Sequence, residues 1–168
     1  MILTGQAIME EVLRKNICIE PFNIEQLNPN SYNYKIGDKI KYYDFHKGIF
    51  IETTIPKEGI KLIPKKLYLA NTFETIGSRN FVTSLIGRSS VGRLGLFVQI
   101  SADLGNLGSP HKWTLELTCI QPLIVYPFMK IGQVSFWSTL GDINLYNGEY
   151  NKYDNPQECL FHTNEVNG

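Results

Sequence analysis

The sequence is poor in the residues that build disulfide frameworks and metal centres. It contains three cysteines and three histidines in 168 residues. Because Cys18, Cys119 and Cys159 are odd in number and far apart, we expect reduced thiols rather than disulfides. No Cys-x-x-Cys pair occurs, and the three histidines lie far from one another. A structural zinc site or a zinc-dependent hydrolase is therefore not expected.

Net charge and long apolar runs are lacking too. The 16 basic residues are balanced by 16 acidic ones, so bulk electrostatic binding to nucleic acid is not expected. No apolar run approaches the roughly 20 residues of a membrane span, and MILTGQAIMEEVLRKN lacks the pattern of a secretion signal. We expect a cytoplasmic protein with no membrane partner. The Gly-x-Ser-x-Gly elbow, the phosphate loop of nucleoside triphosphatases and the dinucleotide-binding glycine pattern are also absent.

The sequence does contain a series of short apolar or alternating segments separated by turn residues. Residues 4–15 predict one helix, because Thr4 can cap it and apolar residues recur at helical spacing. Strand-like segments follow at 31–37, 39–45, 48–55, 67–76, 81–87, 94–101, 113–120, 122–128 and 131–139. This pattern predicts a mainly β sandwich or barrel with an N-terminal helix, in one domain. The polar tail 146–168, with three tyrosines, is either a frayed terminus or a segment that folds over a site.

Two arginines and two serines are concentrated in the stretch GRSSVGRLGL. Arginine presents a planar set of donors that matches phosphate oxygens, and serine hydroxyls with glycine-freed backbone amides can complete an anion site. Arg88 and Arg93 are five residues apart, so a single turn can bring both to one pocket. Taken alone, the stretch is better explained as two surface arginines flanking a flexible turn.

A glycine-rich loop, SADLGNLGSPHK, leads directly into the strand-like segment WTLEL. In a strand, Trp113, Leu115 and Leu117 share one face. Glu116 then points to the opposite face together with Thr114. A carboxylate in so apolar a segment is either exposed to solvent or placed for catalysis. Burial would raise its pKa and suit it to proton transfer.

Together, these segments resemble the dCTP deaminase family, within the trimeric dUTPase-related superfamily. The resemblance runs in order along nearly the whole chain and rests on LNPNSYNYKIG, GRSSVGRLGL, SADLGNLG, WTLEL and YPFMKIGQVSF. The second motif is similar to the family's arginine–serine motif almost letter for letter. The fourth is similar to the strand that bears its catalytic carboxylate. The resemblance implies a jelly-roll β-barrel that assembles as a homotrimer, or a hexamer, with sites at subunit boundaries.

The resemblance further implies hydrolytic loss of ammonia from dCTP, giving dUTP, without zinc. Glu116 would be the general base that activates water. Ser89 would hold that water or the region of cytosine C4, and Arg93 would stabilise the developing charge. Arg88, Ser89 and Ser90 would contact the phosphates, and Mg²⁺ would be bound by the triphosphate rather than by protein ligands.

The resemblance also implies contacts around the nucleoside. Gln133 would read the base or support the loop that does so, Tyr146 would pack on the deoxyribose, and Asn106 would bond its 3′-hydroxyl. Backbone groups at the pyrimidine edge are expected from Gln99, Ile100, Ser101 and Ala102. The remaining substrate contacts are expected at Val91, Gly92, Thr114, Leu115, Lys152 and Tyr153.

Two departures from the family pattern leave alternatives open. Asn106 stands where the family has an aspartate, and an amide cannot act as the base that related dUTPases place near the α-phosphate. In the tail, Glu149 aligns with a lysine that grips phosphate in the family, no Ser-Arg pair follows, and Lys152 could substitute. The sequence therefore also admits a dUTP diphosphatase, a bifunctional enzyme that forms dUMP, and a catalytically silent nucleotide-binding regulator.

Overall fold

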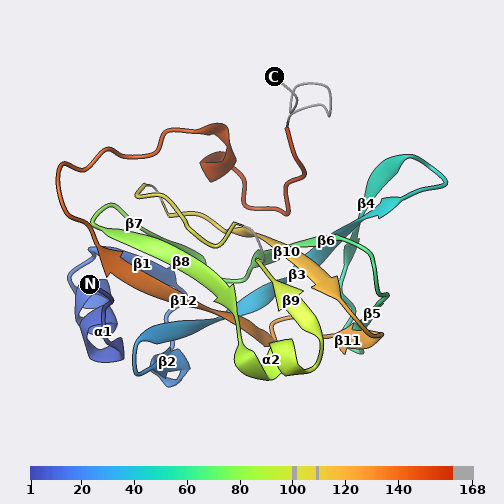
Figure 1. Ribbon diagram of the computed structural model, residues 1–168, viewed down its shortest axis with the longest axis horizontal. Coiled ribbons are helices and arrows are strands. Elements are labelled where there is room, and N and C mark those ends of the chain that lie inside the picture. Colours follow the sequence, from blue (N-terminus) through green and yellow to red (C-terminus); the bar gives the residue numbers. More distant parts are fainter. Residues whose placement is uncertain (100–101, 109, 161–168) are drawn as a thin grey trace.

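The computed structural model describes residues 1–99, 102–108 and 110–160, which fold mainly as antiparallel strands (Figure 1). The strands are β1 (Ile17–Glu20), β2 (Leu27–Asn28), β3 (Ser31–Asp44), β4 (Ile49–Thr54), β5 (Ile60–Leu62), β6 (Tyr68–Thr72), β7 (Thr75–Ser78), β8 (Phe81–Gly87), β9 (Leu96–Val98), β10 (Thr114–Cys119), β11 (Leu123–Val125) and β12 (Lys130–Ser138). The helical elements are α1 (Gly5–Leu13), α2 (Ser89–Arg93) and the 3₁₀ turns η1 (Ile24–Gln26) and η2 (Glu149–Lys152). The expected mainly β fold with an N-terminal helix is confirmed.

The strands form one large sheet and two small ones. The large sheet has the order β8-β12-β3-β6-β10-β9, and β2 and β4 also pair with β3. The small sheets are β1-β7 and β11-β5. Strands twist relative to their neighbours, so a sheet of this width coils on itself. The result is a nearly closed barrel.

The interior of this barrel is filled by side chains that alternate along each strand. In β10, Leu115 and Leu117 are fully buried, and Glu116 between them is only partly buried. Tyr32 and Tyr34 of β3 and Phe136 of β12 belong to the same core. Burying a large apolar side chain stabilises a fold by about 1.5–3 kcal/mol. The core therefore fixes which face of β10 turns outward, and that face carries Glu116.

Helix α1 begins where the sequence predicts. The Thr4 hydroxyl accepts a hydrogen bond from the Ala7 N–H at 3.3 Å, and Ile8 is fully buried under the helix. The helix ends before Lys15, which takes a φ of 62°. Neither α1 nor any other helix in the described residues is long and apolar enough to cross a bilayer.

Strand β3 differs from the expectation, which placed two strands at 31–37 and 39–45. The structure joins them into one 14-residue strand. Its first half pairs with β12 and its second half with β4 and β6, with a register irregularity between the halves. There the Asp38 carbonyl accepts the Ile55 N–H at 2.7 Å. A break in pairing is thus absorbed without ending the strand, as in a β-bulge.

The segment 67–76 differs in the opposite sense, because it was expected as one strand and forms β6 and β7. Glu74 turns inward between them and is 1% exposed. The Thr72 hydroxyl donates to the Glu74 carbonyl at 2.7 Å, which closes the bend. Strands β1, β2 and β5 were not predicted, since two to four residues carry too little periodic signal.

The chain after β12 runs back over the molecule, coloured orange to red in Figure 1. The Asn71 side-chain amide donates to the Asp154 carbonyl at 2.9 Å. The Gln157 N–H donates to the Thr114 hydroxyl at 3.1 Å. These bonds attach the tail to β6 and β10, so the tail is folded onto the barrel at least as far as Glu158.

Candidate active site

A cavity of about 870 Å³, which we call the larger cavity, lies on the outward face of β10. Its volume is in the range of sites that hold small molecules. Thr114 and Glu116 of β10 line it, together with the loop that precedes the strand, the end of β3, β4 and the C-terminal tail. The floor is therefore a strand of the barrel, whereas much of the rim is loop and tail.

Glu116 projects from β10 into this cavity, as the alternation of the strand predicts. Its backbone is held by Gln99. The Gln99 N–H donates to the Glu116 carbonyl at 3.1 Å, and the Gln99 Oε1 accepts the Glu116 N–H at 2.7 Å. Gln99 takes a φ of 52°, in the left-handed region, and its Nε2 donates to the Ala102 carbonyl at 3.2 Å. Its side chain therefore holds the loop against β10.

An aromatic pair forms one wall of the cavity. The rings of His111 and Trp113 have centroids 4.3 Å apart at an interplanar angle of 36°. The Trp113 Nε1 donates to the Ile76 carbonyl at 2.9 Å, which fixes the indole. The sequence placed Trp113 on the core face with Leu115. It packs on the core but also lines the cavity, because β10 begins only at Thr114.

The loop at 102–108 and the start of the tail meet at the rim. Asn106 and Tyr146 both line the cavity. The Tyr146 N–H donates to the Leu107 carbonyl at 2.8 Å. A Cβ at Gly108 would lie only 3.3 Å from the Tyr146 carbonyl, so a side chain there would push the tail away. The residues expected at the deoxyribose are therefore adjacent to one cavity.

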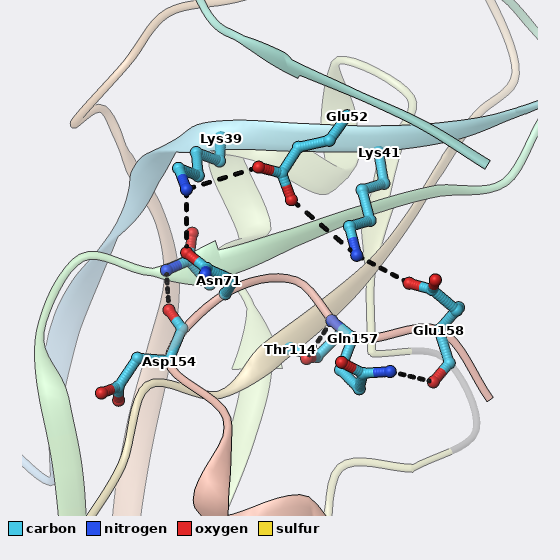
Figure 2. Close-up of polar contacts among 9 residues, drawn as sticks. Lys39, Lys41, Glu52, Asn71, Thr114, Asp154, Gln157 and Glu158 are labelled. Atoms are coloured by element: carbon cyan, nitrogen blue, oxygen red, sulfur yellow. Dashed lines mark hydrogen bonds and ion pairs between the residues drawn. The ribbon is translucent and has the colours of Figure 1, made fainter. Parts of the chain in front are cut away.

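Figure 2 shows how the end of the tail is attached to the barrel. Lys41 of β3 forms an ion pair with Glu158 at 2.7 Å and a longer one with Glu52 at 3.8 Å. Lys39 bonds Glu52 at 3.3 Å and the Asn155 side chain at 3.1 Å. The hydrogen bond from Lys41 holds the pKa of Glu158 below its usual value. The tail is thus bound by charge at one point and places Glu158 in the wall of the larger cavity.

A second cavity of about 250 Å³, the smaller cavity, lies at the start of α2. The described residues that line it are all polar, and they are Asn28, Asn33, Arg88, Ser89, Ser90 and Gln133. The Arg88 guanidinium donates to the Lys130 carbonyl at 3.4 Å and has no carboxylate partner within the described residues. A cation without a counter-ion among hydroxyl and amide groups can bind an anion.

The structure divides the predicted site residues between these two cavities. Gln99, Ala102, Asn106, Thr114, Glu116 and Tyr146 line the larger one. Arg88, Ser89, Ser90 and Gln133 line the smaller one. Within one chain, Glu116 and Ser89 therefore do not share a cavity. Gln133, expected to read the base or to support the loop that does so, lies with the arginine–serine motif.

Other predicted residues line neither cavity. Val91 and Leu115 have buried side chains in the core, and Arg93 is exposed at the end of α2. Lys152 is exposed and pairs with Glu149 at 2.9 Å. The remaining residues in this group are Gly92 and Tyr153. Ile100 and Ser101 lie outside the described residues.

Sequence reasoning missed several residues around the two cavities. In the larger cavity these include His111, Tyr43 and Phe50. In the smaller cavity they are Asn28 and Asn33. Asn28 and Asn33 belong to the motif LNPNSYNYKIG, and the resemblance assigns no role to the side chains of that motif. Across residues 1–99, 102–108 and 110–160, no three His, Cys, Asp or Glu side chains form a group that could hold a metal ion.

Comparison with known proteins finds a matching family and a solved structure with a similar fold. The profile of the family described as dCTP deaminase-like matches residues 2–139. A crystallised 2′-deoxycytidine 5′-triphosphate deaminase from Agrobacterium tumefaciens superposes with a TM-score of 0.65 over 80% of this chain. The match spans 46% of that chain at 19% identity, which supports the fold alone.

Sequence relatives extend over almost the full length. The chain is 38% identical over 174 residues to a "dCTP deaminase, dUMP-forming" from Clostridium acetobutylicum, covering 99% of this chain and all of the relative. It is 42% identical over 167 residues to a protein of the same name from Hathewaya histolytica, covering 95% and 96%. It is 40% identical over 148 residues to a "dCTP deaminase" from Rhodopirellula baltica, covering 84% and 74%. On the strength of this profile match and these identities, the chain belongs to the dCTP deaminase-like family.

Proposed function

We propose that the protein catalyses the hydrolytic deamination of the cytosine ring of dCTP. The observation that carries the proposal is the position of Glu116, whose carboxylate lies in a nucleotide-sized cavity beside an aromatic wall. The names of the relatives supply the substrate. Because free deoxynucleotides are the substrate pool, we place the protein in the cytoplasm.

Glu116 is the general base of the proposed reaction. Its carboxylate takes a proton from a water molecule as the water oxygen forms a bond to cytosine C4. The proton passes to N3, and Glu116 then takes the proton of the new C4 hydroxyl and gives it to the exocyclic amine. The C4–N bond then breaks, ammonia leaves and a uracil ring remains. A positioned general base contributes about 10²- to 10⁴-fold to such a rate.

Ser89 and Arg93 act on the same ring from a second subunit in this proposal. One chain holds Glu116 and Ser89 in different cavities, so a complete site requires two copies. A cyclic homotrimer with head-to-tail interfaces supplies three such pairs. Ser89 then holds the attacking water near C4, and Arg93 stabilises the charge that develops on the ring.

A mixing experiment tests the shared site. Ser89→Ala and Glu116→Gln should each be inactive alone. Co-refolded in equal amounts, they should recover about a quarter of wild-type activity, because in a random cyclic trimer about one boundary in four combines two intact halves. A mixture that remains inactive would overturn the shared site. Arg79→Ala mixed with Glu116→Gln serves as the dilution control, because Arg79 lines neither cavity.

The phosphates bind in the smaller cavity, at Arg88, Ser89 and Ser90. Among the residues that the structure describes, this cavity offers no carboxylate to a metal ion. Its residues therefore do not fit a protein-held Mg²⁺, and the ion would enter as part of the substrate, the magnesium complex of dCTP.

A second product is supported by the relatives, since two of those described above are named dUMP-forming. Forming dUMP requires hydrolysis at the α-phosphate as well as deamination. Asn106 lines the cavity as a neutral amide, which cannot serve as a base for that water. We therefore propose dUTP as the product and dUMP as the alternative.

One assay separates these products. Purified protein with dCTP and Mg²⁺ is followed for ammonia and pyrophosphate together. Ammonia alone supports deamination to dUTP, whereas both products in equal amounts support the dUMP-forming alternative. Tight dCTP binding with neither product would overturn both and identify a nucleotide-binding regulator.

A further inference from the structure

Four polar side chains around the smaller cavity are linked by hydrogen bonds in one continuous series. The Asn33 Nδ2 donates to Asn28 Oδ1 at 3.0 Å. The Asn28 Nδ2 donates to Ser31 Oγ at 3.0 Å. The Ser31 hydroxyl donates to Gln133 Oε1 at 2.9 Å. We call this series the polar relay. It crosses three neighbouring strands, β2, β3 and β12.

The relay has a fixed direction. A serine hydroxyl carries one proton, and an amide presents donors only at nitrogen and acceptors only at oxygen. Ser31 accepts from Asn28, so its single proton is available for Gln133. The Gln133 amide therefore receives a hydrogen bond at its oxygen and has its nitrogen left over. Within the described part of the chain, no protein group accepts from that nitrogen.

The main chain of Asn33, the first residue of the relay, is held by buried groups. The Gln26 Nε2 donates to the Asn33 carbonyl and, at 3.0 Å, to Glu74 Oε1. The Glu74 Oε2 accepts the Lys35 N–H at 2.8 Å. Gln26 and Glu74 are each 1% exposed, and Ser31 is 4% exposed. Side chains this buried and this well bonded cannot rotate freely, so they can impose an orientation on Gln133.

An orientation of this kind matters at an anion site. Gln133 faces the same small cavity as Arg88, Ser89 and Ser90. If its amide were reversed, an acceptor oxygen would point toward a bound anion and repel it. With the relay in place, the nitrogen points there instead and can donate a hydrogen bond.

We propose that Asn28, Ser31 and Asn33 are positioning residues, which fix the Gln133 amide as a hydrogen-bond donor to a phosphate group of the substrate. The identity of that ligand, a nucleoside triphosphate, rests on the proposed function. The orientation itself rests on the relay. Gln133 thus belongs to phosphate recognition rather than to reading the base.

Removing the Ser31 hydroxyl is the first test. Ser31→Ala should raise the KM for dCTP about 3- to 10-fold, the value of one hydrogen bond, and leave kcat within about 2-fold. Ser31→Thr, which keeps the hydroxyl, should restore the KM. The matched control is Ser135→Ala, also at a strand serine but outside both cavities, and its KM should not change. An unchanged KM in Ser31→Ala would overturn the proposal.

A binding measurement separates this proposal from the proposed function. Calorimetric titration with inorganic tripolyphosphate should show weaker binding to Ser31→Ala than to wild type, by the same factor. Deoxycytidine, which lacks phosphates, should bind both equally. If tripolyphosphate binding falls but no protein releases ammonia, the relay stands and the proposed reaction fails. If ammonia is released normally and tripolyphosphate binds both proteins equally, the relay fails and the reaction stands.

Two further variants keep the test decisive if Ser31→Ala folds poorly. Gln133→Glu has the same shape but offers only acceptors, so it should bind tripolyphosphate at least about 10-fold more weakly. In a Gln133→Ala background, Ser31→Ala should cause no further loss, because its effect passes through Gln133. Additive losses in that double variant, or unchanged binding in Gln133→Glu, would contradict the proposal.

Discussion

The two cavities are built in different ways. The smaller cavity is framed by neighbouring strands, and its polar side chains are cross-linked by the relay and supported by Gln26 and Glu74. The larger cavity has β10 as its floor, and the bonds that attach the tail to Asn71, Thr114 and Lys41 lie at groups that are only partly buried. Segments with few buried contacts open more readily than core strands. We therefore expect the smaller cavity to be more rigid than the larger one.

The largest effect is expected in the larger cavity, where the proposed base can be removed. Glu116→Gln keeps the size of the side chain but removes the base. Ammonia release from dCTP should fall about 10²- to 10⁴-fold, while dCTP binding changes little. Steady-state kinetics and calorimetry measure the two quantities. The control is Glu25→Gln, which changes an exposed carboxylate on η1. Near-normal turnover in Glu116→Gln would contradict the proposal that Glu116 is the base.

The second-largest effect is expected in the smaller cavity, where we propose that the phosphates bind. Arg88→Ala removes the cation of the smaller cavity, and a hydrogen bond to a charged group contributes about 1.5–3 kcal/mol. The KM for dCTP should therefore rise about 10- to 100-fold, with a smaller rise for dCMP. Arg14→Ala, at the residue that follows α1, should leave both constants unchanged. Equal effects on dCTP and dCMP would mean that Arg88 does not distinguish the terminal phosphates.

A stability measurement tests whether the smaller cavity is as rigid as its contacts indicate. Glu74 accepts hydrogen bonds at both carboxylate oxygens, so Glu74→Gln must leave one donor facing an NH₂ group. The free energy of unfolding in urea at pH 7 should fall by about 1–3 kcal/mol. The exposed control Glu25→Gln should change it by less than about 0.5 kcal/mol.

The pH dependence of Glu74 has a definite sign. Burial raises the pKa of Glu74, and hydrogen bonds from the Lys35 N–H and Gln26 only partly oppose this. The folded protein therefore binds the proton more tightly than the unfolded chain does. The wild-type free energy of unfolding should gain a component as pH falls through the raised pKa, and Glu74→Gln should lack that component. An identical pH slope in both proteins would contradict this assignment.

The smallest expected effect concerns the tail. Glu158→Gln breaks a partly exposed ion pair with Lys41, and such pairs contribute about 0–1 kcal/mol. The KM for dCTP should shift less than about 5-fold, with hydrogen exchange at the tail faster than in wild type. Because the pKa of Glu158 is lowered, the contact is complete above pH 4.5 and is lost only as pH falls through the lowered value. Unchanged exchange would mean that the ion pair does not hold the tail.

Local sequence patterns predicted one side of the site better than the other. The alternation around Leu115 and Leu117 correctly turned Glu116 outward, because a period of two is a local property of a strand. The association of Gln133 with Arg88 was not predictable in this way. It depends on β12 lying between β3 and β8, which is a matter of topology. Motif order identified the family, but it did not show that one chain separates Glu116 from Ser89.

The polar relay could not be predicted from the sequence. Asn28, Ser31 and Asn33 are ordinary turn and strand residues in sequence, with no spacing that marks a site. Their role depends on strand pairing, because Asn28 lies across from Ser31 and Asn33 lies across from Gln133. Side-chain hydrogen bonds of this kind form only after the strands are in register. The bend at Glu74 escaped prediction for the same reason.

The tail carries Cys159, the exposed one of the three cysteines, at the rim of the larger cavity, and Trp113 lies in the wall of that cavity. A thiol-reactive dye should therefore label Cys159 in preference to Cys18 and Cys119. In a variant whose other tryptophan is removed by Trp137→Phe, energy transfer from Trp113 to this dye would then report the distance between the tail and the cavity wall in solution. The protein thus contains a natural donor and a natural attachment point for measuring how far the tail lies from the cavity wall.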